Sequence, residues 1–246
     1  MTVRVLLLGG TGEARSLAEQ LVARDGFEVV SSLAGRLTTP LLPPGRVRLG
    51  GFGGVAALAE WLHAERIDAV VDATHPFADT ITAHAAEATR RLGLPFLVLR
   101  RPGWQPGPGD DWHWVDTVAE AGTLLPRLGR RVFLATGRGG LAAFADRTDL
   151  WFLLRAVDPP PEPLPAHRHV VLARGPFDVR AERALLEEHR IDVVVTRDSG
   201  GTATYAKLAA ARDLGLPVVV VRRPPLPRAP VVSTEDEVVL WLDTHR

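Results

Sequence analysis

The sequence contains no cysteine, and this absence excludes several classes of protein at once. Without thiols the chain cannot hold a disulfide framework, a thiolate metal site or an iron–sulfur cluster, and it has no cysteine nucleophile. It also lacks an excess of either charge, because 29 Lys and Arg residues balance 29 Asp and Glu residues. Balanced charge gives no global basic field for a nucleic-acid backbone. We therefore expect neither a nucleic-acid partner nor a metal cofactor.

Long hydrophobic runs are missing as well. No apolar stretch approaches the length of a membrane span, and the first residues lack the small-residue cleavage site of a signal peptide. We expect a cytoplasmic protein with no membrane partner. With 246 residues, of which 46% are hydrophobic, the chain can form one large α/β domain or two domains with a core each.

The first hundred residues alternate between strand and helix patterns. Residues 3–8 form a continuous apolar run typical of a central parallel strand, and apolar spacings of three and four predict a helix at 13–24. This alternation continues and predicts parallel strands connected by helices. Further strands are expected at 27–31, 69–73 and 96–99, and further helices at 55–64 and 77–92.

Two segments of the first half recur in the second half. The string RIDAVV at 66–71 matches RIDVVV at 190–195, and LGLP at 92–95 is repeated at 214–217. A period of about 120 residues is too long for a solenoid. It predicts an α/β protein with two Rossmann-like domains, related by internal duplication, whose parallel sheets surround a shared cleft.

The stretch 103–115 is rich in glycine and proline and is the expected domain boundary. The first domain is then 1–103 and the second 104–246, and the C-terminal helix can pack back on the first domain. One continuous sheet with a duplicated motif is the alternative.

A glycine-rich turn follows the first strand, where a Rossmann domain binds a pyrophosphate. Gly10, Thr11, Gly12 and Glu13 lie between strand and helix, where backbone N–H groups and the helix dipole attract an anion. The dinucleotide fingerprint is only partly met, since Arg15 stands where its third glycine belongs. The turn is either a dinucleotide site in the first domain or only a change of chain direction.

The second strand ends without the carboxylate that would bind the ribose of NAD. Ser32 and Arg36 follow instead, and a hydroxyl with a guanidinium suits the additional 2′-phosphate of NADP. We therefore expect NADPH as the cofactor, with these two residues as partners of the phosphate.

Three residues follow the strand at 69–73 at its carboxyl end, where open α/β sheets bind ligands. They are Thr74, His75 and Pro76, and we take them as candidate cofactor contacts, with Pro76 in the first turn of a helix. His75 is a candidate acid, a stacking surface for the nicotinamide, or a histidine at the start of a helix with a backbone partner.

Lys207 is the only lysine of the chain and Tyr205 the only tyrosine. A lysine, unlike an arginine, has a compact head and can lose its proton. Because helical side chains tilt toward the N-terminus, we expect Lys207 to reach back to an anion over residues 199–202 and to anchor a carboxylate there. An accidental lysine is the alternative. His75, Tyr205 and Lys207 are the candidate catalytic residues, because each side chain can donate a proton to a bound substrate.

Several arginines stand at loop edges in the second half. Guanidinium groups that converge on one region suit a polycarboxylate, since each grips a carboxylate with two hydrogen bonds. Each arginine alone is equally well an ordinary solvated side chain. The candidate substrate contacts are Arg138, Arg155, Arg174, Arg197, Ser199, Gly200, Gly201 and Lys207.

Taken together, these motifs resemble the precorrin-6A reductase family of cobalamin (vitamin B12) biosynthesis. The resemblance rests on GGTGEA at 9–14, DATHPFA at 72–78, RGPF at 174–177 and the block at 199–207, and it covers essentially the whole chain. It implies two Rossmann-like domains and an NADPH-dependent reduction of one double bond of precorrin-6A, or of its cobalt-loaded equivalent, to give precorrin-6B. It implies a tetrapyrrole substrate and no flavin or metal, and other enzymes of the pathway are candidate partners for hand-over.

Other functions remain open at this point. A short-chain dehydrogenase needs a Tyr and a Lys separated by three residues, and the pair here is separated by one. A two-domain glycosyltransferase would bind a nucleotide sugar, and a non-catalytic redox sensor would bind NADP without turnover. Affinities for NADPH and nucleotide sugars, together with a turnover assay, distinguish these alternatives.

Overall fold

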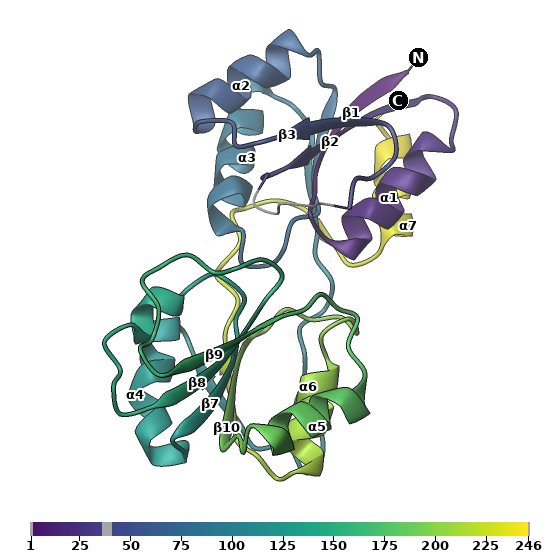
Figure 1. Ribbon diagram of the computed structural model, residues 1–246. Coiled ribbons are helices and arrows are strands. Elements are labelled where there is room, and N and C mark those ends of the chain that lie inside the picture. Colours follow the sequence, from purple (N-terminus) through teal and green to yellow (C-terminus); the bar gives the residue numbers. More distant parts are fainter. Residues whose placement is uncertain (1, 36–40, 246) are drawn as a thin grey trace. The chain divides into compact units, whose positions relative to one another are not determined.

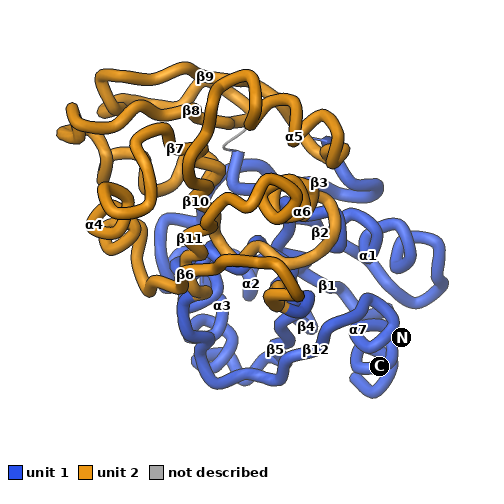
Figure 2. The backbone as a smooth tube through the Cα atoms, turned by 90° about the horizontal axis from the view of Figure 1, so that it is seen from below, with its two compact units in different colours: residues 1–102, 224–246 blue, residues 103–223 orange. Residues whose placement is uncertain are grey.

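The computed structural model describes residues 2–35 and 41–245, and the chain divides into two compact units (Figure 2). Unit 1 comprises Met1–Pro102 and Pro224–Arg246, and unit 2 comprises Gly103–Arg223. The expected second domain, 104–246, is therefore too long at its C-terminal end. Residues 224–246 belong to unit 1. The sequence analysis allowed such a return only for the C-terminal helix.

Unit 1 is built on a six-stranded sheet in which all strands are parallel. The strands lie in the order β3-β2-β1-β4-β5-β12, which is the Rossmann order 3-2-1-4-5-6. They are β1 (Val3–Leu8), β2 (Phe27–Leu33), β3 (Arg46–Leu49), β4 (Ala69–Asp72), β5 (Phe96–Leu99) and β12 (Val231–Val232).

Helices cover both faces of this sheet (Figure 1). Alternate residues of β1 serve the two faces: Leu7 packs in one core with α1 (Gly12–Val22) and α7 (Glu235–Asp243). Leu6 and Leu8 pack in the other core with α2 (Val55–Ala64) and α3 (Asp79–Leu92). A strand buried on both faces explains why residues 3–8 are continuously apolar.

Unit 2 repeats the same parallel arrangement, with strand order β9-β8-β7-β10-β11-β6. Its strands are β6 (Trp112–Val115), β7 (Arg131–Ala135), β8 (Trp151–Ala156), β9 (Arg168–Leu172), β10 (Val193–Arg197) and β11 (Val218–Val221). Its helices are α4 (Val118–Leu128), the short 3₁₀ helix η1 (Leu141–Phe144), α5 (Val179–Glu188) and α6 (Ala206–Asp213).

The sixth strand of each sheet comes from the other half of the sequence. β6 follows β5 along the chain but pairs with β11 in unit 2, and β12 follows β11 but pairs with β5 in unit 1. Each is followed by a helix that a threonine caps: Thr117 begins α4 and Thr234 begins α7. The two repeats have therefore exchanged their last strand and helix.

The backbone confirms the internal repeat and corrects some element bounds. Arg66 and Arg190, at equivalent positions, both have left-handed φ angles, of 51° and 50°. The edge strand β3 escaped the sequence analysis because it is short and alternates charged and apolar residues. Helix α3 begins at Asp79 and not at residue 77, so Pro76 is not in its first turn: the N–H of Ala78 donates to the His75 carbonyl (2.8 Å) in a preceding turn.

None of the helices among the described residues combines the length and apolar character needed to cross a membrane.

Candidate cofactor pocket and substrate loops

The turn between β1 and α1 is shaped by glycine and fixed by threonine. Gly10 has a φ of 117°, which glycine adopts without strain. Thr11 is the N-cap of α1: its Oγ1 accepts a hydrogen bond from the N–H of Ala14 (3.1 Å) and donates to the carbonyl of Ala73 (2.8 Å). The second bond ties this turn to the residue that follows β4.

Gly12, the first residue of α1, leaves the approach to the helix N-terminus open. A Cβ built on Gly12 would find no heavy atom within 4 Å. The backbone N–H groups of a helix N-terminus attract anions, and at Gly12 there is no side chain of this residue to block the approach. The turn therefore fits the pyrophosphate of a dinucleotide.

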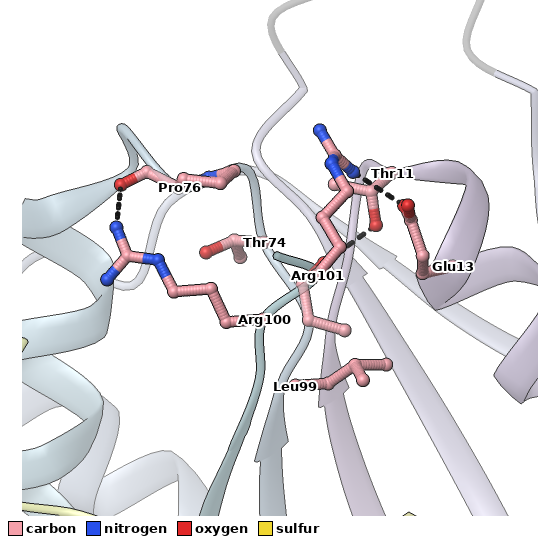
Figure 3. Close-up of a pocket in the computed structure, with 8 residues that line it drawn as sticks. Thr11, Glu13, Thr74, Pro76, Leu99, Arg100 and Arg101 are labelled. Atoms are coloured by element: carbon pink, nitrogen blue, oxygen red, sulfur yellow. Dashed lines mark hydrogen bonds and ion pairs between the residues drawn. The ribbon is translucent and has the colours of Figure 1, made fainter. Parts of the chain in front are cut away.

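A pocket lies beside this turn in unit 1 (Figure 3). It is lined by Thr11, Glu13, Ala73, Thr74, Pro76, Leu99, Arg100 and Arg101. The sequence identified four of these residues as candidates, but it missed the two arginines. Their signal was present, since Arg100 and Arg101 directly follow β5 at its carboxyl end, where parallel sheets bind ligands.

Both arginines are held within unit 1. Arg101 Nη1 lies 2.7 Å from Glu13 Oε2, and Arg100 Nη2 donates to the carbonyl of Pro76 (2.9 Å). Glu13 stands in the first turn of α1, where the helix dipole stabilises its carboxylate. The same carboxylate would repel a phosphate bound at this turn. Arg101 neutralises that carboxylate beside the turn.

Asp72, the last residue of β4, is almost fully buried. Its Oδ1 accepts hydrogen bonds from the backbone N–H of Thr74 (2.9 Å) and from Thr74 Oγ1 (2.7 Å). Its Oδ2 has no hydrogen-bond partner among the described residues. A buried carboxylate oxygen without a partner is unfavourable, so a donor on a ligand at this end of β4 would be stabilising.

The remaining cofactor candidates lie differently from expectation. His75 Nδ1 accepts a hydrogen bond from the N–H of Phe77 (3.3 Å), which matches the backbone-partner alternative. Ser32 is inside β2 and only 6% exposed, which is a poor position for a phosphate ligand. Arg36 lies outside the described residues. No group of three or more His, Asp or Glu side chains in residues 2–35 and 41–245 is placed to hold a metal ion.

In unit 2, the loop after β7 lies against the end of β10. A Cβ at Gly139 would overlap the guanidinium of Arg197, so that guanidinium packs directly on the glycine. Arg138 belongs to the same loop. The structure thus brings the loop that carries one candidate arginine into contact with a second.

The loops after β9 and β10 also meet. The N–H of Phe177, which closes the exposed Arg174 turn, donates to the carbonyl of Ala203 (3.3 Å). Gly200 and Gly201 both have left-handed φ angles, of 67° and 68°. The indole Nε1 of Trp104 donates to the Gly201 carbonyl (2.8 Å). The Ser199–Gly201 turn is therefore fixed from the interior of unit 2.

Lys207 does not take the position expected from the sequence. Its side chain is buried, and its Nζ donates to the carbonyl of Thr204 (2.6 Å) and not toward residues 199–202. Burial, reinforced by the nearby Arg155, lowers the pKa of Lys207 to about 7.

Two other candidates are also held inside unit 2. The hydroxyl of Tyr205 accepts a hydrogen bond from Arg212 Nη2 (2.7 Å), and Arg212 forms an ion pair with Asp110. Arg155 is not a loop-edge arginine, because it is buried and paired with Glu182. Both candidates therefore have their polar groups paired within unit 2.

The strand orders define this protein as a Rossmann-like α/β protein with two six-stranded parallel sheets. Residues 4–243 match the family model described as precorrin-6x reductase CbiJ/CobK, and the chain belongs to this family.

Similar proteins cover the chain almost completely. A precorrin-6A reductase of Rhodococcus erythropolis is 57% identical over 98% of both chains, and one of Mycobacterium tuberculosis is 53% identical over 97% of both. A solved structure titled CobK precorrin-6A reductase superposes with a TM-score of 0.93 at 43% identity, covering 100% of this chain and 97% of the other.

Proposed function

We propose that this chain reduces one double bond of precorrin-6A with NADPH, giving precorrin-6B in cobalamin biosynthesis. Family membership carries this proposal, because the similarity to relatives named precorrin-6A reductase extends over almost the whole length of each. Unit 1 holds NADPH and unit 2 holds the macrocycle in this proposal. NADPH supplies the hydride when bound, and the protein supplies binding, orientation and a proton.

The β1–α1 turn and the adjoining pocket suit the pyrophosphate and nicotinamide halves of the cofactor. Gly10 and Gly12 allow close approach to the helix N-terminus, and Thr11 holds the turn. Arg101 offsets the carboxylate of Glu13. Thr74, His75 and Pro76 flank the buried Asp72 at the end of β4, where a polar group of the cofactor would find an acceptor.

NADPH is favoured over NADH because no carboxylate follows β2 up to Arg36. Ser32 is buried, so Arg36 is the principal proposed partner of the 2′-phosphate. An arginine offers a planar fork of donors that matches a phosphate.

The macrocycle carries several carboxylates, and the carboxyl edge of the unit 2 sheet offers groups that bind them. Guanidinium groups grip carboxylates with paired hydrogen bonds, and the glycine turn offers backbone N–H groups. The proposed contacts are Arg138, Arg174, Arg197, Ser199, Gly200 and Gly201.

The reduction also needs a proton. His75 is our candidate donor, because it stands at the carboxyl end of β4, whereas Tyr205 and Lys207 are engaged inside unit 2. Its Nδ1 accepts a hydrogen bond from the N–H of Phe77, which orients the ring at this end of β4.

The test is a spectroscopic assay with metal-free and cobalt-loaded precorrin-6A, each with NADPH and with NADH. We expect NADPH oxidation to accompany loss of the precorrin-6A spectrum, with NADH much less effective. Tight NADPH binding without turnover of either substrate would instead indicate a redox sensor. Binding of nucleotide sugars in place of NADPH would indicate a glycosyltransferase.

A further inference from the structure

Three charged side chains lie in the interior of unit 2, below the loops assigned to the substrate. They are Arg155 of β8, Glu182 of α5 and Lys207 of α6, with exposures of 7%, 3% and 2%. Arg155 Nη1 donates to Glu182 Oε1, and Glu182 Oε2 has no hydrogen-bond partner within the described part of the chain. Buried charges are costly, and this cluster contains two cations for one anion.

The ion pair supports the turn that carries Arg174. The guanidinium carbon of Arg155 lies 3.8 Å from the ring centroid of Phe177, a cation–π distance. The backbone N–H of Phe177 donates in turn to the carbonyl of Ala203. A chain of contacts therefore runs from the buried pair to the loop after β10.

Lys207 and Trp104 hold the two ends of one loop segment. Trp104 Nε1 donates to the carbonyl of Gly201, and Lys207 Nζ donates to the carbonyl of Thr204. The ammonium also lies 4.6 Å from the centroid of the Trp104 ring. The two side chains thus form one support under residues 201–204, and both approach the loop from the interior.

We propose that Lys207 is a positioning residue for substrate binding: it fixes the Thr204 carbonyl from below and so keeps the Ser199–Thr204 loop in its substrate-binding form. It does not touch the substrate itself. The inference rests on the proposed function for what the loop binds, whereas the anchoring of the loop can be measured without any substrate.

The titration of Lys207 gives the anchoring a distinctive pH dependence. The charged groups that face it are Arg155 from β8 and Glu182 from α5, and burial together with Arg155 keeps its pKa at about 7. In an opened loop with a hydrated lysine, the pKa returns toward its ordinary value of 10.5. Protonation therefore favours the open form, and the loop is held more firmly above pH 7 than below it.

Hydrogen exchange of the backbone amides at 200–205 tests the anchoring directly. After correction for intrinsic rates, we expect exchange in the unaltered protein to be about tenfold or more faster at about pH 6 than at about pH 8.5. Lys207→Met should exchange fast at both pH values, and Lys207→Gln, a neutral donor, should lose the pH step. The control Leu208→Met, equally buried on the same helix, should behave like the unaltered protein.

Kinetics supply the second readout. Lys207→Met should raise the KM for precorrin-6A about tenfold, with kcat within about threefold and NADPH affinity unchanged, because only substrate binding is disturbed. A loss in kcat of about a hundredfold at constant KM would overturn the proposal in favour of proton donation. Unchanged exchange in Lys207→Met would overturn it as well. If the unaltered protein failed to reduce precorrin-6A, the proposed function would fail, while the exchange experiment would still decide the anchoring.

Discussion

Units 1 and 2 share a strand order and a set of repeated contacts, yet they differ at the first crossover. In unit 1, β1 leads through the Gly10–Thr11 turn into α1, an 11-residue helix with a threonine cap. In unit 2, β7 leads through a loop containing Arg138 into η1, a 3₁₀ helix of four residues without a side-chain cap. Only the first arrangement provides a helix dipole and an open N-terminus for a pyrophosphate.

The repeated parts are those that define the scaffold. Asp68 Oδ2 accepts a hydrogen bond from the N–H of Arg4 (2.8 Å), and Asp192 Oδ2 accepts one from the N–H of Arg131 (2.8 Å). These equivalent bonds join the residue before β4 to β1 in unit 1 and the residue before β10 to β7 in unit 2. Duplication has preserved the interior, and the loops at the carboxyl edges have diverged, so the proposed division of labour resides in the loops.

The largest expected effects come from closing a glycine site in each unit. Gly12→Val would place a side chain where the pyrophosphate approaches, and we expect NADPH affinity to fall at least about a hundredfold while the fold is retained. Gly139→Ala would displace the Arg197 guanidinium, so the KM for precorrin-6A should rise with NADPH affinity unchanged. Isothermal titration with NADPH and steady-state kinetics measure the two effects.

If the two units have different roles, Gly12→Val should affect only NADPH binding and Gly139→Ala only the KM for precorrin-6A. Circular dichroism and thermal unfolding serve as controls for the fold of both variants. Full NADPH affinity in a folded Gly12→Val protein would move the cofactor away from the β1–α1 turn. Weakened NADPH binding in Gly139→Ala would show that the roles are not divided between the units.

A smaller effect concerns the choice between NADPH and NADH in unit 1. An ion pair with a phosphate contributes about 1.5 to 3 kcal/mol, or roughly ten- to hundredfold in affinity. Arg36→Ala should weaken NADPH binding by that amount and leave NADH binding unchanged. Equal loss for both cofactors, measured by titration, would remove Arg36 from the 2′-phosphate.

The ion pair between Arg101 and Glu13 can also be tested through NADPH affinity, and we expect a change of about tenfold. Arg101→Met leaves the Glu13 carboxylate uncompensated at the N-terminus of α1, so NADPH should bind about tenfold more weakly, a change of about 1.4 kcal/mol. Glu13→Gln in the same protein should restore part of the affinity. A double-mutant cycle with no coupling would show that the pair does not act on the cofactor.

How far the sequence could predict this molecule follows from the range of each signal. The central strands and most helices were predictable because apolar runs and helical spacing are local, and the repeat indicated two related units. The exchange of the last strands was not predictable, because β6 and β12 pair across about a hundred residues or more of sequence, and no local pattern records the partner.

The site shows the same limit at the level of single side chains. Thr11 and Thr74 were identified because they lie in the turns that follow β1 and β4, and Arg101 stood in an equivalent place after β5. The interior position of Lys207 could not be predicted from its being the only lysine of the chain. Whether its ammonium group points to a ligand or to the Thr204 carbonyl depends on tertiary packing.

The last expected effect is on stability, and it concerns unit 2, which contains the buried lysine, and not unit 1. Because the folded pKa of Lys207 is about 7 and the unfolded value is 10.5, the unfolded chain binds more protons between these pH values. The free energy of unfolding therefore rises with pH in this window, by up to about 1.4 kcal/mol per pH unit. Below pH 7 the full cost of burying the charge is present.

Lys207→Met removes this contribution. We expect the variant's Tm, relative to that of the unaltered protein, to be highest below pH 7 and to fall by a few degrees per unit as the pH rises toward about 10. Calorimetry at matched ionic strength measures the difference, and Leu208→Met, whose side chain does not titrate, should show a constant one. A difference between Lys207→Met and the unaltered protein that stayed constant across this range would mean that Lys207 is charged in the folded protein up to its ordinary pKa, and that its burial is compensated by the Thr204 carbonyl and the Trp104 ring.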